Sequence, residues 1–187
     1  MASAPFDIIS GPATVWLAPV GEAFPTIGAA VAGNFVTLGR TEGGVTVTHN
    51  ESIELLRVDQ DTGPVKGIRS EESLVIEFSL AELTLERYAL VLNNQTVTDN
   101  AGVDREFPLR AGLDVDRRAL LCRGDLSPYE SGNLQYEVPI VVQTGSPAIS
   151  FVRDDKSVLE VEFTAIEDPA AGSAEERFGV LRAAESV

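Results

Sequence analysis

The feature of this sequence that most constrains its fold is an alternation of apolar and polar residues with a period of two. It is clearest in 157–168, where Leu159, Val161 and Phe163 alternate with glutamates and other polar residues. Successive side chains of a strand point to opposite faces, so this pattern predicts a strand with one buried face. Antiparallel sheets often leave their other face in water. We therefore expect a mainly β, antiparallel sandwich or barrel.

Four long segments carry this pattern, each with an apolar face and a face of Thr, Ser, Gln, Asn and Glu. They are 45–56, 67–80, 133–143 and 157–167. In 133–143, strict alternation places Val138, Ile140 and Val142 on one face. Pro139 lacks a backbone N–H, which indicates a sheet edge or a β-bulge at that position. Shorter strands are expected at 13–18, 35–40 and 119–124, with a further one considered at 105–110.

One short α-helix is predicted over 84–94, directly after the strand that ends near Leu80. Thr84 is suited to cap its N-terminus, and Glu86 lies favourably in its first turn. Asn93 or Asn94 is suited to end it in a left-handed conformation. A helix this short is marginal alone and must pack on the sheet. The stripe expected to make that contact is Leu85, Tyr88, Ala89 and Leu92.

The first two long segments, 45–56 and 67–80, predict an extended hairpin whose loop, 56–67, has a polar tip. Its turn chemistry is typical of a solvated loop. The tip residues are Asp59, Gln60, Asp61, Thr62, Gly63 and Pro64. We expect residues 1–187 to form a single domain, in which 168–187 is a linker followed by an edge strand.

Composition excludes several classes of function. The chain has 187 residues, with 14 Lys and Arg against 29 Asp and Glu, a formal net charge of −15. Such a chain lacks the basic footprint of a DNA-reading protein. It has one cysteine, no segment resembling a signal peptide, and no apolar run of the ~18 residues that a membrane span needs. We expect a soluble protein that folds in a cytoplasm and binds no membrane.

Catalytic and metal-binding signatures are weak. His49 is the only histidine and Cys122 the only cysteine, so neither has an obvious partner for metal binding or nucleophilic catalysis. The sequence DQDTG resembles part of a calcium loop, but strands flank it and the later ligands are missing. A surface histidine, a buried cysteine and a solvated hairpin tip are the favoured interpretations. We expect no enzyme activity and no cofactor.

The polar faces of the long strands carry negative charge without Lys or Arg at the same alternate positions. A solvated sheet face is common, but exposed strands often use Lys as well. A surface whose charged residues are all acidic therefore indicates that it faces another negatively charged molecule, to which it must not bind. The residues expected on this surface are Thr46, Thr48, Glu54, Glu77, Glu137, Glu160 and Glu162.

Several segments, in order along most of the chain, resemble the major tail tube proteins of long-tailed, siphovirus-type bacteriophages. They are SGPATVWLAPVGEAFP, LGRTEGGVTVTHNESIE, SEESLVIEFSLAELTLERYALVLNN, VEFTAIEDP and ERFGVL. The resemblance implies a β-sandwich with one flanking helix. It also implies hexameric rings that stack into a hollow tube, with strands from each subunit forming a barrel around a lumen for genomic DNA.

The same resemblance implies where the protein acts and with what. The 56–67 hairpin would reach a neighbouring subunit or ring, and Glu77 and its neighbours would face the lumen. Implied partners are further copies of the chain, a tape measure protein, a tail terminator and distal tail or baseplate proteins. DNA would pass without sequence-specific binding. The expected location is the virion tail, after assembly in the host cytoplasm.

Two other functions stay open at this stage. One is a related tube subunit of a contractile tail or a type VI secretion-like system. The other is a stand-alone β-sandwich binding module, for example for carbohydrate. Such modules usually present aromatic platforms, whereas only 6% of this chain is aromatic and it has one Trp.

Overall fold

A computed structural model describes residues 11–92, 96–109, 112–129, 132–149, 153 and 156–185. These residues are mainly antiparallel β, as the alternation predicts, and they contain a single α-helix. The elements are β1 (Ala13–Pro19), β2 (Val36–Thr37), β3 (Thr41–Arg57), β4 (Pro64–Leu80), α1 (Leu85–Val91), β5 (Thr98–Asp99), β6 (Arg105–Glu106), β7 (Arg118–Gly124), β8 (Leu134–Gln143), β9 (Leu159–Ala165), the 3₁₀-helix η1 (Ala174–Glu176) and β10 (Val180–Ala183).

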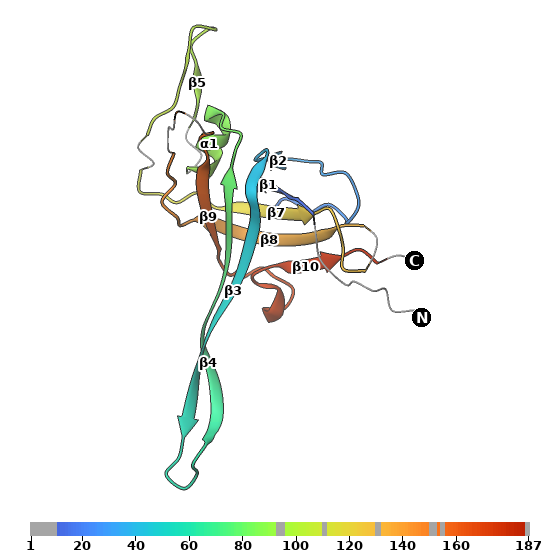
Figure 1. The fold of residues 1–187 in the computed structure, drawn as a ribbon, viewed down its shortest axis with the longest axis vertical. Coiled ribbons are helices and arrows are strands. Elements are labelled where there is room, and N and C mark those ends of the chain that lie inside the picture. The colour runs from blue at the N-terminus through green and yellow to red at the C-terminus, as the bar shows by residue number, and fades with distance from the viewer. Residues whose placement is uncertain are drawn as a thin grey trace.

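The main sheet has the strand order β2-β1-β7-β8-β9-β4-β3, and β10 also pairs with β8. The first half of β8 pairs with β10, whereas its last residues pair with β9. The sheet therefore folds over at β8 into two layers. In Figure 1, β3, β4 and β9 run along the long axis of the molecule, while β7, β8 and β10 run across it.

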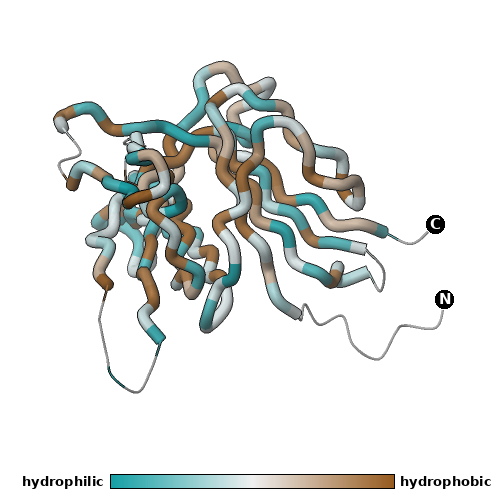
Figure 2. Tube along the Cα trace, turned by 90° about the horizontal axis from the view of Figure 1, so that it is seen from above, coloured by the Kyte–Doolittle hydropathy of each residue, from teal (hydrophilic) through white to brown (hydrophobic). Residues whose placement is uncertain are grey.

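The hydrophobic core lies between these two layers. Val15, Leu120 and Ile76 are fully buried there, and the rings of Phe78 and Phe163 stack with their centroids 6.1 Å apart. Figure 2, a view down the long axis, shows apolar and polar residues alternating along the strands that enclose this core. The period-two pattern thus sets which face of each strand is buried.

A β-bulge in β8 changes the alternation expected for 133–143. Leu120 of β7 pairs with Val138, and Arg118 pairs with Val141, so three residue steps of β8 match two of β7. Val138 and Val141 are both buried, and Val142 pairs with Thr164 on the opposite face. The prediction that Val142 shares a face with Val138 is wrong, because the bulge beside Pro139 inserts one extra residue.

Helix α1 begins as predicted and packs differently. The hydroxyl oxygen of Thr84 accepts a hydrogen bond from the Arg87 N–H at 3.3 Å, which caps the helix. Ala89 and Val91 are buried, but Leu85 is exposed. The stripe prediction is wrong at Leu85, because a two-turn helix buries its C-terminal turn and leaves its first turn at the rim. The expected stop residues, Asn93 and Asn94, lie outside the described residues.

Strands β3 and β4 continue past the sandwich as a two-stranded ribbon, which we call the arm (residues 50–72). Every residue of the arm is exposed. At about 3.3 Å per residue, the strand residues 50–57 carry it about 26 Å beyond the sandwich. Figure 1 shows the arm projecting along the long axis, away from α1 and β5.

Among the described residues, no helix is both long and apolar enough to cross a membrane.

Candidate acidic surface and projecting arm

The outer face of β3, β4 and β9 carries carboxylates and hydroxyls in cross-strand rows. Thr46 pairs with Glu77, and Glu77 pairs with Glu162 on its other side. These side chains point outward because their neighbours along each strand enter the core. We call this surface the acidic face. It is formed by Thr46, Thr48, Glu77, Ser79, Glu160, Glu162 and Thr164.

The carboxylates of the acidic face form no ion pair with another described residue. Within the described part of the chain, no Lys or Arg forms an ion pair with Glu77, Glu160 or Glu162. Glu162 instead accepts a hydrogen bond from the Thr144 hydroxyl at 2.8 Å. Like charges directly opposite each other on neighbouring strands destabilise a sheet. The Glu77–Glu162 pair therefore opposes folding stability and calls for a functional reason.

A shallow hollow of about 340 Å³ lies on this face beside a widened part of β3. The pairing skips from Glu42 to Val45, which leaves Gly43 and Gly44 outside the ladder. Both glycines have positive φ, at 73° and 91°, a conformation that other residues rarely adopt. At the rim, Lys156 pairs with Glu42 at 2.8 Å. The described residues contain no group of three or more His, Cys, Asp or Glu placed to hold a metal ion.

The structure brings five of the seven predicted surface residues together and separates two. Thr46, Thr48, Glu77, Glu160 and Glu162 lie on the acidic face. Glu54 lies on the arm, opposite Ile68 and beyond the sandwich.

Glu137 lies on the other layer of the sandwich. It is only 7% exposed. Its carboxylate accepts hydrogen bonds from Gln135 Nε2 at 2.6 Å and from Arg182 Nε at 3.1 Å. Alternation predicts that Glu137 points away from the core, but it does not reveal that the first half of β8 belongs to the second layer. We therefore leave Glu137 out of the acidic face.

A buried polar network holds this second layer to the long loop after β1. Arg123 donates to the Ala29 carbonyl at 2.6 Å and to Gln135 Oε1 at 2.8 Å. Gln135 in turn donates to the Pro25 carbonyl at 2.9 Å. Burial lowers the pKa of Arg123, and the charge of Glu137 opposes that shift. The network therefore holds in one conformation a loop whose composition alone predicts flexibility.

The arm carries exposed apolar side chains on both sides of its polar tip, and the sequence pattern did not identify them as a group. They are exposed on a ribbon only two strands wide. They comprise Ile53, Leu55, Leu56, Val58, Val65 and Ile68. Their sequence signal was the apolar content of IELLRV before the turn.

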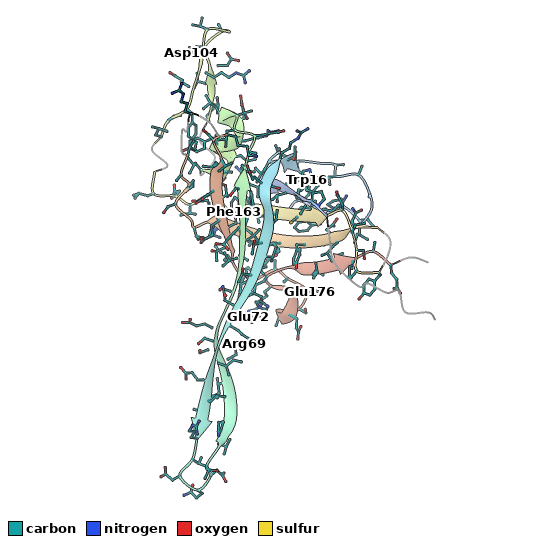
Figure 3. The ribbon with its side chains drawn as sticks, in the orientation of Figure 1. Trp16, Arg69, Glu72, Asp104, Phe163 and Glu176 are labelled. Carbon is teal, nitrogen blue, oxygen red and sulfur yellow. The ribbon has the colours of Figure 1, made fainter. Side chains whose placement is uncertain are left out.

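An ion cluster lies at the root of the arm. Arg69 contacts Glu51 at 2.8 Å and Glu72 at 3.5 Å, and His49 Nε2 lies 2.6 Å from Glu72. Figure 3 shows Arg69 and Glu72 where the ribbon leaves the sandwich. The cluster ties both strands together beside a register shift between Ser52 and Ile53. It therefore stiffens the arm where β-bulges bend a ladder.

No protein-family model and no curated protein matches the sequence. Among solved structures, a chain of the six-fold symmetrised anti-feeding prophage (AFP) baseplate aligns with a TM-score of 0.50 at 7% identity, covering 98% of this chain and 97% of that chain. The two chains share a fold. A chain from the tail of an empty GTA particle with C6 symmetry aligns with a TM-score of 0.43 at 11% identity, covering 98% of this chain and 99% of that chain.

Proposed function

We propose that this chain is a structural subunit of a phage-type tail, and specifically a tail tube subunit whose acidic face lines the lumen. The row Thr46–Glu77–Glu162, which has no cationic partner among the described residues, carries the proposal. A surface that keeps two opposed carboxylates against their mutual repulsion is suited to face another polyanion without binding it. The fold shared with an AFP baseplate chain over almost the full length supports the same class.

Ring formation accounts for the long free edge of the sheet. In the described structure, β3 stands at the end of the strand order and pairs only with β4. An edge of 17 residues invites uncontrolled association unless another strand covers it. Closing copies into a ring covers such edges and continues the acidic face from subunit to subunit. We propose six copies, since the AFP baseplate is six-fold symmetrised.

The mechanism is passive. Duplex DNA carries one charge per ~1.7 Å of its axis. At ~8 Å in water, one carboxylate and one phosphate repel by about 0.5 kcal/mol before screening, which is close to thermal energy. Single contacts therefore neither hold nor stop the DNA. Repeated around and along the lumen, the carboxylates and hydroxyls keep a layer of water and ions in which DNA slides.

The arm supplies contacts between subunits or rings in this proposal. Its tip, Asp59 to Pro64, projects far from the sandwich. Stacking through unlike surfaces repeats without closing, so it generates a tube. The further partners are those of a tail: a tape measure protein, a terminator, and distal tail or baseplate proteins. The location is the virion tail.

A second candidate is a baseplate subunit that forms one ring and does not stack on itself. The observation in its favour is that the AFP chain of the same fold comes from a baseplate structure. Both candidates predict rings with a central hole. They differ in whether the rings polymerise.

Negative-stain microscopy of the purified protein tests the proposal directly. We expect hollow tubes of stacked rings as concentration rises. Single rings that never stack favour the baseplate candidate. Featureless monomers at all concentrations, in protein that is folded by circular dichroism, contradict both.

A further inference from the structure

The long loop between β1 and β2, which we call the strap (residues 20–35), contains no helix or strand, and none of its residues is buried. Figure 1 shows it arching beside β7 and β8. Side chains of the sheet donate hydrogen bonds to two of its backbone carbonyls, those of Pro25 and Ala29. The conformation of the strap therefore depends on groups that the sheet supplies.

The strap covers the outer face of β7. Leu120 and Cys122 of β7 belong to the core, whereas Leu121 points to the opposite face and is nevertheless 0% exposed. Arg123 lies on the same face as Leu121, because side chains two apart on a strand share a face. Its guanidinium donates to the Ala29 carbonyl at 2.6 Å, so the strap lies across this face. Lifting the strap would expose apolar surface of β7, which favours the closed position.

Gln135 of β8 joins the strap to the rest of the polar network. Its amide oxygen accepts two N–H groups of Arg123. Its amide nitrogen donates to the Pro25 carbonyl at 2.9 Å and to the Glu137 carboxylate at 2.6 Å. These bonds use both lone pairs and both N–H groups of the amide. Gln135 is fully buried, so a change at one partner leaves a buried polar group unpaired unless the others move.

The charges along this network are ordered. The Glu137 carboxylate receives the Nε of Arg182, from β10, at 3.1 Å from each of its oxygens. Arg123, at the other end, is bound only to neutral acceptors in the described structure. Burial lowers the pKa of Arg123, and the charge of Glu137 opposes that shift, so the two groups already interact. A buried carboxylate needs a cation, and two guanidinium groups are within its reach.

We propose that β10 holds the strap closed through this network. Arg182 compensates the charge of Glu137, which leaves Arg123 and Gln135 to hold the two strap carbonyls. Without Arg182, Glu137 takes its compensating cation from Arg123, and the strap loses its donors. The inference goes beyond the proposed function, because it concerns a single subunit and holds whether or not copies of the chain assemble.

Strand β10 is suited to control the strap because it is short and accessible. It has four residues, and within the described structure it pairs only with β8. Gly179, at φ 116°, lets the chain approach the Glu137 carbonyl closely just before β10 begins. Leu181 is 51% exposed. Elements with few buried contacts open most readily, so a partner that displaces β10 would also release the strap.

Protease cleavage after Ala29 reports directly on the closed strap. A serine protease must seat the carbonyl oxygen of the cleaved bond among its own donors, so a carbonyl held by Arg123 is protected. Elastase accepts small side chains and suits this bond. In Arg182→Gln, the rate of this cleavage, followed by mass spectrometry, should rise roughly fivefold or more over the parent. The Arg182 side chain is 53% exposed, so we expect the variant to fold.

A second substitution separates the charge of Glu137 from the stability of β10. Glutamine at this position carries no charge and needs no cation. Cleavage after Ala29 in Glu137→Gln, and in the Glu137→Gln/Arg182→Gln double variant, should therefore stay within about twofold of the parent. A double variant that is cleaved as fast as Arg182→Gln overturns the inference, because Arg182 would then act without Glu137.

Two controls complete the test, with digestion at concentrations too low for light scattering to detect assembly. Arg177→Gln removes the exposed ion pair with Glu167, just before β10, and should leave cleavage after Ala29 unchanged. Cleavage after Ala101, in the exposed β5–β6 turn, reports on the fold as a whole. Parent-like cleavage after Ala29 in Arg182→Gln, or equal acceleration after Ala101 or in Arg177→Gln, overturns the inference.

Discussion

Glu77 and Glu162 face each other across β4 and β9, and this pairing is the residue-scale basis of the proposed lumen. Their repulsion lowers subunit stability, and no ion pair with a described Lys or Arg offsets it. The arrangement is understandable if the pair faces another negatively charged molecule and repels it. In the proposed function, the sign of the charge and the position of the row determine what this surface does.

Reversing that sign should slow DNA passage. In particles carrying Glu77→Lys and Glu162→Lys, we expect tubes of normal shape, because both changes lie on an outer face. Ejection, followed as DNA release after receptor triggering, should slow several-fold, since ammonium groups bind phosphate. The matched control is Glu175→Lys with Glu176→Lys on η1, outside both the acidic face and the arm. Normal ejection kinetics in the double variant count against the lumen assignment.

Cys122 offers a prediction about the core. Burial raises the pKa of its thiol to about 12, well above the ordinary value. The thiolate is the reactive form, so at neutral pH roughly a thousand times less of it is present than in a free thiol of pKa 9. We expect maleimide labelling of the native protein to be negligible at pH 7 and complete in denaturant. Rapid labelling of folded protein would show that β7 is not buried.

At the scale of elements, the arm depends on the ion cluster at its root. Arg69→Met removes the bonds to Glu51 and Glu72 while keeping an unbranched apolar stem. Exposed ion pairs are individually weak, so we expect global stability to fall by less than about 1 kcal/mol. Amide exchange in the arm should nevertheless rise measurably, whereas Lys66→Met, which also removes a cation of the arm but none of the cluster at its root, should leave it unchanged. Equal exchange in both variants contradicts the stiffening role.

Shortening the arm tests its part in assembly. Replacing residues 59–64 by Asn-Gly closes the hairpin with a favourable two-residue turn. The thermal midpoint of the subunit should change little, because these residues touch no core. Tubes should become shorter or need a higher protein concentration, as measured by light scattering and microscopy. Tubes of unchanged length at unchanged protein concentration would show that the tip makes none of the proposed contacts.

How well the sequence predicts each element depends on whether both of its faces are constrained. In β9, the alternation of Leu159, Val161 and Phe163 identifies strand and buried face correctly, because a core covers one side. In β8, Pro139 indicates the bulge. Only the register with β7 shows that Val142 points to the face opposite to the one that alternation predicts. Alternation also cannot assign a strand to a layer, which is why Glu137 was grouped with distant carboxylates. The apolar side chains of the arm were missed because no second layer of the described chain covers them, so alternation has no buried face to report there.

At the scale of the whole molecule, the shape and the charge are suited to repetition. Within the described residues, the sandwich has a long unpaired strand edge at β3, an acidic outer face beside it, and different exposed surfaces at its two ends. A net charge of −15 keeps free subunits apart at low salt. We therefore expect assembly to be promoted by salt that screens this charge, and light scattering over a salt series will check it. Assembly that weakens steadily with salt contradicts a contact based on apolar surfaces.

The most direct test of the central claim is a cryo-EM map of the assembled protein at side-chain resolution. The account predicts a central hole lined by the outer face of β3, β4 and β9, with Glu77 and Glu162 of every subunit pointing into it. A particle without a hole, or one with these two glutamates on its exterior, would contradict it.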